Sequence, residues 1–422
     1  MDYFCSTRYI IVMIKGIYTL TLAIVALVAF VSCGEDRTHE YLELTAENQW
    51  TYTQMKENYL WGNEIKSPEK KEFFATPSKF FKSILSKDDD TSFLTDSASS
   101  TSYGMRFTIM RDPIGEKRNQ YYALVLFVEP GSPAAVAGIE RGTWIASIGG
   151  KAMTSSMSSS LQSGVATEIT TRTIEYNDDE ELYFWSEPDT ITMPQASAVT
   201  EEAVYLHSTY SLRNGKVGYI VCNNLDGDNV TSQFSDILLG FAAEDITDII
   251  LDMRYCSGGT IENAANVASM FVPASLSGMP FAKSVDKDSA ETLFSYSEQV
   301  ANMSDKKLYI VTGNDTKGIA ELFITSVNAS RGMHEVVTVG EETNGSNLLT
   351  KKIESPYGFT ICPAVAYLYA SDGELLQADG IEADYPLNEL EEPEHIFPLG
   401  SKQEYILRNI EYLIINGSLP TE

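Results

Sequence analysis

The chemistry that the sequence indicates most directly is the lipidation of a cysteine, Cys33. Lys15 precedes an apolar run over residues 16–31, and the small residue Ser32 stands directly before the cysteine. A basic start, a short apolar run and a small residue at the cleavage point are the parts of a bacterial export signal. A cysteine just after that point supplies the thiol that receives diacylglycerol. We therefore expect residues 1–33 to be a lipoprotein signal peptide.

The same segment also fits a membrane anchor that is retained. Its apolar run is close to the roughly 17 residues that a spanning helix needs at minimum. Residues 30–32 form a loose lipobox of the kind found in Bacteroidetes-type lipoproteins, and translation could begin at Met1 or at Met13. We expect a lipid-anchored protein of the cell envelope, in the outer membrane on its periplasmic or its surface side. The lipid anchor is the only membrane association expected.

The spacing of histidine and cysteine gives no sign of a metal site or a disulfide framework. The residues are His39, His207, His334 and His395, with Cys222, Cys256 and Cys362 in the mature chain. Zinc ligands come in pairs a few residues apart, and these histidines are scattered. A disulfide framework has an even number of cysteines, and this number is odd. We expect no metal and no other cofactor.

Length and composition describe a large folded protein with an acidic surface. The 422 residues are 43% hydrophobic, enough for two or three domains with their own cores. Lys and Arg total 30 against 59 Asp and Glu, which gives a net charge of -29. A field of that sign repels nucleic acid and anionic lipid, so neither is expected as a partner.

The elements that must position any site follow two patterns. Residues 46–86 have helical periodicity, and Thr76 followed by Pro77 indicates a helix start. From residue 215 onward strands and helices alternate, which predicts an α/β layered domain. The expected strands are 217–221, 248–252, 308–312 and 336–340, and the expected helices are 231–243, 262–271 and 319–329.

Between these regions, residues 101–174 resemble a PDZ domain of the bacterial type. The strand candidate 121–128 leads into PGSPAAVAGIERGTWIASIGGKAM over residues 130–153. Such domains bind an extended C-terminus as an added strand and hold its carboxylate with backbone amides. The resemblance implies a peptide-binding loop and strand formed by Tyr103, Gly104, Met105, Arg106 and Phe107.

Three further phrases resemble the C-terminal-processing peptidases, or tail-specific serine proteases. They are LDMRYCSGGTIENAANVASMFV (251–272), VGEETNGSN (339–347) and LLQADGIEADYPL (375–387). The first matches the family's strand and glycine turn, in which backbone N–H groups stabilise the oxyanion of the substrate. The resemblance therefore implies that Gly258 and Gly259 form the oxyanion turn, and with the PDZ-like block it covers nearly the whole mature chain.

The family's catalytic residues do not carry over to this sequence. The family's serine lies in Thr-Ala-Ser-Ala-Ser-Glu, and the matching run 316–321 puts Gly318 at the nucleophile position and Ala320 at the second serine. The family's base is a lysine between two glycines, where this chain has Ser346, and Thr350 replaces the usual glutamine. Glycine has no side chain that can attack a carbonyl. The resemblance thus implies the family architecture without an intact dyad.

Replacement groups are conceivable. Lys317 and Ser346 could form an inverted dyad, but Lys317 would need a desolvated site to become a base. Cys256 or Ser257 could act beside the glycine turn, and His334 could serve as a base. Nothing in the sequence places any of these groups in a catalytic arrangement.

We interpret the chain as a multidomain α+β protein with a ClpP/crotonase-like α/β core. The expected parts are the signal peptide (1–33), an N-terminal helical domain (34–97), the PDZ-like domain and linker (98–200) and the peptidase-like core (201–422). The leading hypothesis is a catalytically inactive homologue that binds peptides or unfolded protein C-termini. The alternatives are an active serine-type endopeptidase with a rearranged Ser/Lys dyad, and a binder of small lipophilic ligands like the related retinoid-binding protein of the vertebrate eye.

Overall fold

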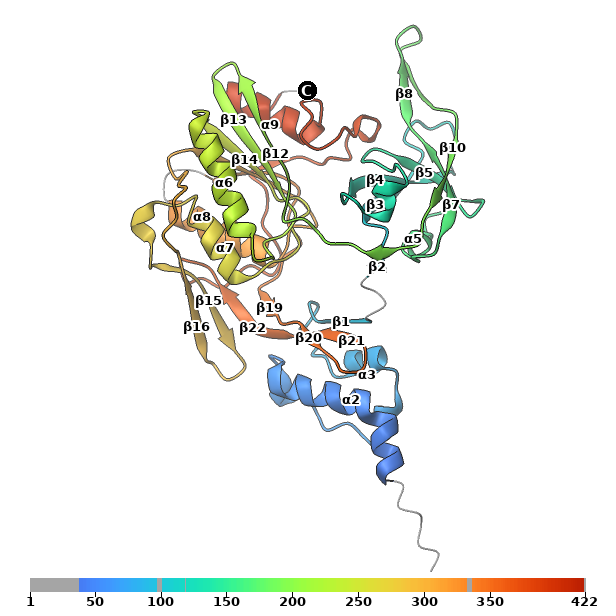
Figure 1. Cartoon of the computed structure of the whole chain (residues 1–422), viewed down its shortest axis with the longest axis vertical. Helices are drawn as coiled ribbons and strands as arrows, with labels where there is room; N and C mark the ends of the chain where they lie inside the picture. Colours follow the sequence, from blue (N-terminus) through green and yellow to red (C-terminus); the bar gives the residue numbers. More distant parts are fainter. Residues whose placement is uncertain (1–37, 97–100, 118, 332–335, 421–422) are drawn as a thin grey trace, which may run out of the picture. The chain divides into compact units, whose positions relative to one another are not determined.

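The computed structural model describes residues 38–96, 101–117, 119–331 and 336–420 (Figure 1). The chain divides into two compact units, Met1–Gln54 with Lys66–Ile84 and Met55–Ile65 with Leu85–Glu422. The expected signal peptide, with Cys33, and the candidate base His334 lie outside the described residues. Within the described ranges, no helix combines the length and the apolar character of a membrane span.

The first unit is helical, as the N-terminal periodicity predicts. Its helices are α2 (Thr38–Asn58), which continues into the second unit, a 3-10 turn η2 (Glu72–Phe74) and α3 (Pro77–Ser83). Pro77 is the first residue of α3 and Thr76 precedes it in an extended conformation, so the predicted helix start is confirmed. The buried Asn48 amide donates to the carbonyl oxygens of Phe73 and Ala75 at 2.9 and 2.7 Å, which fixes α2 to the segment before α3.

In the second unit, residues 101–198 form a β-rich region around a six-stranded sheet in the order β10-β7-β5-β4-β3, with β6 on β5. The strands are β3 (Met105–Arg111), β4 (Tyr121–Val128), β5 (Trp144–Ile148), β6 (Lys151–Ala152), β7 (Thr167–Arg172) and β10 (Asp189–Met193). Two short helices, α4 (Pro133–Val136) and α5 (Ser158–Leu161), connect them. Two ribbons, β2 (Thr101–Ser102) with β11 (Ser197–Ala198) and β8 (Ile174–Asn177) with β9 (Leu182–Trp185), accompany this sheet. The predicted strand over 121–128 is β4.

The rest of the second unit is built on another six-stranded sheet, in the order β12-β13-β14-β17-β18-β23. The strands are β12 (Val204–Leu212), β13 (Gly215–Cys222), β14 (Asp248–Asp252), β17 (Lys307–Thr312), β18 (Val336–Gly340) and β23 (Tyr385–Pro386). All are parallel except β12, which runs antiparallel to β13. Helices α6 (Val230–Ala243), α7 (Ile261–Ala268) and α8 (Ile319–Arg331) connect the parallel strands, and α9 (Tyr405–Asn416) follows them. The alternation predicted from residue 215 onward is confirmed.

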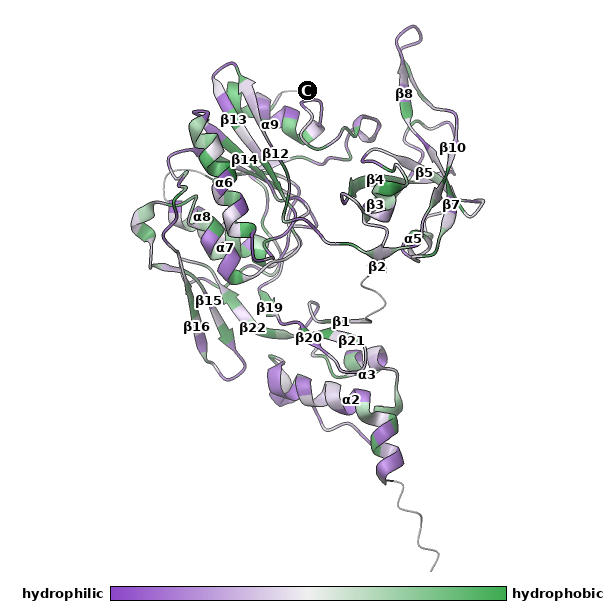
Figure 2. Ribbon diagram, in the orientation of Figure 1, coloured by the Kyte–Doolittle hydropathy of each residue, from purple (hydrophilic) through white to green (hydrophobic). Residues whose placement is uncertain are grey.

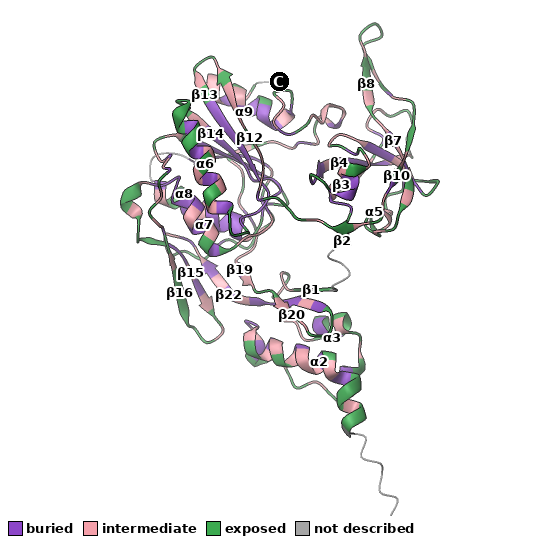
Figure 3. Cartoon of the chain, viewed as in Figure 1, coloured by how far each residue is buried: buried purple, intermediate pink, exposed green. Residues whose placement is uncertain are grey.

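Helices cover both faces of this sheet, which explains why its strands are continuous apolar runs. Ile249 and Leu251 of β14 face the core formed with α6, α7 and α8, whereas Ile250 between them faces the core formed with α9. The sheet therefore carries apolar side chains on both faces and is buried at the centre of this region (Figures 2 and 3).

Two smaller sheets complete the second unit. One has the order β1-β21-β20 and the other the order β16-β15-β22-β19. Their strands are β1 (Phe93–Asp96), β21 (Phe359–Cys362), β20 (Ile353–Glu354), β16 (Glu291–Ser295), β15 (Pro280–Asp286), β22 (Ala364–Tyr369) and β19 (Leu348–Thr350). The fold is thus a mixed α/β multi-sheet structure with N-terminal helices. The finer assignments, PDZ-like and ClpP/crotonase-like, remain predictions.

Candidate functional site

Three turns that carry the sequence motifs meet at one edge of the parallel sheet. They are residues 253–259 after β14, 313–318 after β17 and 341–346 after β18. Because the carboxyl ends of neighbouring parallel strands lie at the same edge, such turns form the usual site of an open α/β sheet. The backbone N–H of Lys317 donates to the carbonyl oxygen of Cys256 at 3.2 Å, and that of Asn344 donates to Thr316 at 2.9 Å. The structure therefore brings the three motifs together.

A buried carboxylate, Glu321, holds two of these turns in place. Its side chain is 1% exposed. It accepts hydrogen bonds from the backbone N–H of Gly318 at 2.6 Å, the N–H of Gly345 at 2.7 Å and the Thr343 hydroxyl at 2.5 Å. Burial raises the pKa of Glu321, and these hydrogen bonds oppose the rise. We call Glu321 and these three donors the Glu321 network.

The sequence patterns gave no role to Glu321, although its apolar neighbours could have indicated a buried charge. It is a charged residue in the first turn of α8, where its neighbours Ala320 and Leu322 are fully buried. A charge in such surroundings requires hydrogen-bond partners. Its partners lie 22 and 24 residues further along the chain, at Thr343 and Gly345, so only the fold reveals them.

Two threonines extend this support to the other motifs. The buried Thr316 hydroxyl donates to the Met253 carbonyl oxygen at 2.8 Å, which connects the second turn to the first. The Thr343 hydroxyl also accepts from the N–H of Ile381 at 2.8 Å, which attaches the closing motif 375–387. All three sequence segments that resemble the peptidase family are therefore connected by one set of hydrogen bonds.

The expected nucleophile position, Gly318, lies directly before α8. Its φ is +58°, a conformation that side-chain-bearing residues rarely adopt. A methyl group added there would meet no other heavy atom within 4 Å, so the space beside Gly318 is open. The turn thus presents an open position at the start of a helix, with no side chain on it.

The expected base position, Ser346, follows the glycine that Glu321 holds. Ser346 is half-buried, and its hydroxyl accepts only a long hydrogen bond, 3.4 Å, from the N–H of Leu348 among the described residues. Thr350 lies further along, at the end of β19, where it pairs with Ala364. One carboxylate thereby holds both Gly318 and Gly345, the residue before Ser346, whereas Thr350 belongs to a neighbouring strand.

Lys317, the candidate base of an inverted dyad, is exposed. Among the described residues its ammonium group has no hydrogen-bond or ion-pair partner, and nothing connects it to the Ser346 hydroxyl. An exposed ammonium lacks the dry surroundings that turn a lysine into a base. The geometry gives no support to Lys317 and Ser346 as a pair.

The predicted oxyanion turn keeps free backbone donors. Gly258 accepts a hydrogen bond from the N–H of Leu225 at 2.9 Å, but the N–H groups of Gly258 and Gly259 have no acceptor among the described residues. An added methyl group at Gly258 would also meet only open space. The neighbouring Cys256 is fully buried, so its thiol does not reach that space. This turn therefore retains backbone N–H groups that can donate to the carbonyl oxygen of a bound chain.

The predicted peptide-binding loop begins the edge strand β3. Tyr103 is buried and donates its hydroxyl hydrogen to the Val165 carbonyl oxygen. Gly104 has φ +72°, and a methyl group there would lie 2.2 Å from the Ser132 side chain, so only glycine fits. Among the described strands β3 pairs with β4 alone, so its other edge is free. Met105 and Phe107 are half-buried on this strand.

Arg106 connects the strand β3 with the turn before Gly318. Its guanidinium group donates to Glu201 at 2.8 Å and to Asp315 at 3.0 Å. It is therefore neutralised by two carboxylates and does not stand free for a peptide carboxylate. This contact was not predicted, because Asp315 is 209 residues away in the sequence.

Glu129 is an acidic group buried beside this loop. Its N–H donates to the Gly104 carbonyl oxygen at 2.8 Å, and its side chain is only 4% exposed. Neither carboxyl oxygen makes a hydrogen bond of good geometry among the described residues. Burial, together with the negative charge of Glu201, raises the pKa of Glu129 to about 7.

A second buried polar cluster, which we call the arginine network, connects the β-rich region with the parallel sheet. Arg141 donates to Glu389 at 2.7 Å, and Arg254 donates to Glu404 at 2.8 Å and to Asp252 at 2.7 Å. Burial alone would raise the pKa of Glu389, but the charges of Arg141 and Arg254 lower it to about 2. The network therefore holds ionised carboxylates inside the protein.

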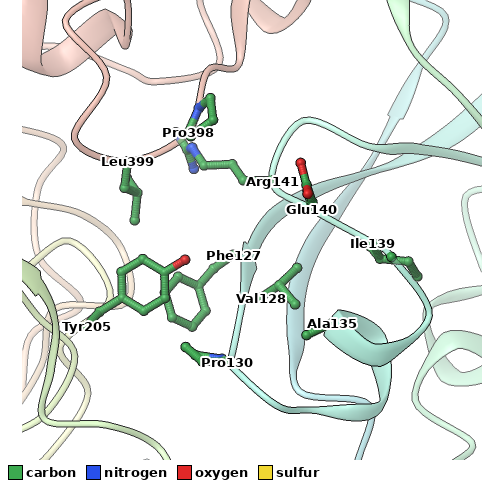
Figure 4. Close-up of a pocket in the computed structure, with 11 residues that line it drawn as sticks. Phe127, Val128, Pro130, Ala135, Ile139, Glu140, Arg141, Tyr205, Pro398 and Leu399 are labelled. Atoms are coloured by element: carbon green, nitrogen blue, oxygen red, sulfur yellow. The ribbon is translucent and has the colours of Figure 1, made fainter.

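A cavity of about 460 Å³ lies beside the arginine network (Figure 4). Figure 4 shows Tyr205 and Leu399 on one side of it and Val128 and Ala135 on the other. Its charged residues are Glu140 and Arg141, and Arg141 is already engaged in the arginine network. The remaining side chains of the wall are Phe127, Pro130, Ile139 and Pro398.

Comparison with known proteins places this framework in a family. Residues 216–387 match peptidase family S41, and residues 46–93 match the peptidase S41 N-terminal domain. A Staphylococcus aureus protein named as a probable CtpA-like serine protease is 20% identical over 263 residues, which cover 61% of this chain and 48% of that protein. The Staphylococcus epidermidis protein of the same name is 20% identical over 190 residues, 45% of this chain and 37% of that one. The match thus spans half or less of the length of these curated relatives.

Solved structures show the same fold. A Bacteroides fragilis protein assigned as an S41 protease superposes with a TM-score of 0.75 and 24% identity, covering 87% of this chain and 97% of that one. The photosystem II D1 C-terminal processing protease superposes with a TM-score of 0.52 and 15% identity, over the same shares of the two chains. The chain belongs to peptidase family S41, the C-terminal-processing peptidases.

Proposed function

We propose that this S41 homologue binds peptides or unfolded protein C-termini without cleaving them. The observation that carries the proposal is the identity of the residues in the turns that the Glu321 network holds. This network holds the two turns that carry positions 318 and 346, yet glycine and serine occupy these positions. A serine needs a base to become a nucleophile, and Lys317, the lysine directly before Gly318, is exposed.

The peptide would bind at the free edge of β3. An extended chain added there finds unpaired backbone groups, and the turn at Gly104 resembles the carboxylate loop of a PDZ domain. Met105 and Phe107 offer half-buried apolar surface on the same strand. The free N–H groups of Gly258 and Gly259 would hold a second part of the bound chain at the former cleavage cleft.

Peptide binding can be tested with a fluorescein-labelled 12-residue peptide that ends in an apolar residue with a free carboxylate. We expect saturable binding that is about tenfold tighter than binding of the same peptide as its C-terminal amide, a difference of about 1.4 kcal/mol. Met105→Glu places a negative charge next to the loop and should weaken binding at least tenfold. Met110→Glu makes the same change at the other end of β3 and should change binding less than about threefold.

The outcome of that titration decides the peptide proposal. If the native protein binds neither peptide while its circular dichroism shows a folded chain, peptide binding is wrong. If the acid and the amide bind equally and Met105→Glu has no effect, the β3 edge is the wrong site.

We also propose that Cys33 carries a lipid that anchors the protein in the cell envelope. The support is the sequence alone, a basic residue, an apolar run and a small residue before the cysteine. In bacteria fed radiolabelled palmitate, the full chain should incorporate label and sediment with the envelope fraction. A Cys33→Ala chain that incorporates as much label would contradict the anchor.

A second candidate function is the binding of a small apolar ligand in the cavity of Figure 4. The cavity volume, about 460 Å³, is in the range of ligand pockets, and most of its wall is apolar. The uncharged dye N-phenyl-1-naphthylamine should then gain fluorescence with the native protein. Ala135→Trp would fill the cavity and remove most of the gain, whereas Val136→Trp, on the exposed side of α4, should retain it. No gain with the native protein would exclude this candidate.

A further inference from the structure

Two of the three described cysteines lie together beneath the glycine turn. Cys222 is the last residue of β13, and Cys256 lies in the turn after β14. Both side chains are fully buried in the same apolar core. The Cys222 thiol donates to the Asn224 carbonyl oxygen at 3.3 Å, and Cys256 lies close enough to raise the pKa of the Cys222 thiol.

The backbone fixes this neighbourhood independently of the thiols. Val221 pairs with Asp252 in the parallel register of β13 and β14. Beyond the strands, the N–H of Ser257 donates to the Asn223 carbonyl oxygen at 3.3 Å. Each cysteine stands one residue before a member of this bonded pair. The two cysteines therefore stand on neighbouring segments whose backbones are hydrogen-bonded to each other.

We propose that Cys222 and Cys256 form a disulfide bond when the chain folds in an oxidising compartment. The reaction is thiol–disulfide exchange with a small-molecule disulfide or a protein disulfide oxidant. One cysteine thiolate attacks the oxidant and releases one thiol; the second cysteine then attacks the mixed disulfide and releases the other. One Cys222–Cys256 bond forms, the oxidant's disulfide is reduced to two thiols, and the two cysteine protons go to those leaving sulfurs. This inference does not rest on the proposed function.

The same burial determines when this reaction can occur. The contact with Cys256 and burial raise the pKa of the Cys222 thiol, which lowers the fraction of reactive thiolate in the folded protein. Oxidation is therefore expected during folding or transient opening, and slow oxidation is expected once the reduced chain has folded. Disulfides are formed and kept in extracytoplasmic compartments. A bond here would fix the end of β13 to the turn that carries Gly258 and Gly259.

A tryptic digest separates the two cysteines. Trypsin cleaves after Lys216, Arg254 and Lys283, so Cys222 lies in the peptide 217–254 and Cys256 in the peptide 255–283. The full chain is unfolded and reduced, refolded in a glutathione redox buffer, quenched with acid, denatured, and treated with N-ethylmaleimide before digestion. We expect most of both peptides to appear as one linked species that dithiothreitol separates. Recovery of both peptides as N-ethylmaleimide adducts would overturn the proposal.

Matched variants show whether the bond is specific. Cys222→Ala and Cys256→Ala should each remove the linked species, whereas Cys362→Ala should leave it unchanged. The oxidised native protein should also unfold several degrees above the reduced one, and Cys222→Ala should show no such difference. A main product that joins Cys362 to either cysteine would contradict the proposal. If neither alanine variant folds, the digest of the native protein still decides.

Discussion

The second unit contains two buried polar networks that differ in what they hold. In the arginine network, Arg141 and Arg254 neutralise buried carboxylates and so connect the β-rich region with the parallel sheet. In the Glu321 network, a carboxylate binds backbone N–H groups and so fixes two turns. Neither network needs a reacting side chain for its own stability. The difference teaches that a buried charge can either connect two regions of the fold or fix the turns of a site.

Breaking the arginine network should have the largest effect on stability. Arg254→Met leaves Asp252 and Glu404 buried with too little positive charge, so we expect a loss of about 3–5 kcal/mol in the free energy of unfolding. Urea denaturation at pH 7 measures the loss. The exposed Arg408, which pairs with Glu392, is the matched control, and Arg408→Met should cost less than about 1 kcal/mol. Equal losses in the two variants would show that the buried network contributes no more to stability than an exposed ion pair.

Breaking the Glu321 network should cost somewhat less. Glu321→Ala leaves three donors of the two turns without an acceptor, and we expect a loss of about 2–4 kcal/mol. Glu262→Ala, in the exposed first turn of the neighbouring helix α7, should cost about 0.5 kcal/mol. Hydrogen exchange should also become faster at the amides of Gly318 and Gly345. Unchanged exchange at these amides would mean that the carboxylate does not hold the turns.

A substitution of Glu129 should have the smallest effect on stability, and that effect should depend on pH. Its pKa is raised from 4.5 to about 7, so the folded protein favours the neutral carboxyl. Its contribution to stability is complete below pH 4.5 and is lost as the pH rises through 7. Glu129→Gln should therefore gain about 1–2 kcal/mol over the native protein at pH 8 and almost nothing at pH 4.5. Urea midpoints at the two pH values measure this, with the exposed Glu140→Gln as a control that should show no such trend.

The sequence predicted the parts of the fold in which residue pattern and burial coincide. The runs 248–252 and 336–340 are β14 and β18 to the residue, because strands buried on both faces are continuously apolar. The hairpin β15–β16 was not predicted, since strand β16 is largely exposed and has no such run. Residues 182–185 of β9 were not predicted as a strand, and they lie within residues 98–200, interpreted as the PDZ-like domain and linker.

The residues that hold the site together were harder to predict than the residues of the site itself. The resemblance pointed to Gly258, Gly318 and Ser346, and the fold brings their turns together. It gave no role to Glu321 or Arg141, because their functions arise from contacts across long sequence distances. Arg141 meets Glu389 248 residues later in the chain, and no local pattern records such a partner.

The measurement that tests the central claim most directly is the digestion of denatured casein by the purified protein. The native protein, Ser346→Ala and the double variant Gly318→Ser/Ser346→Lys are compared over a long incubation, with a mock purification as the control for contaminating proteases. Serine fits the open space at Gly318, although its φ of +58° costs about 1–2 kcal/mol. We predict no casein fragments from the native protein or from Ser346→Ala, and fragments from the double variant would show that only the dyad is missing. Fragments from the native protein that disappear in Ser346→Ala would contradict the account, because the chain would then be an active peptidase.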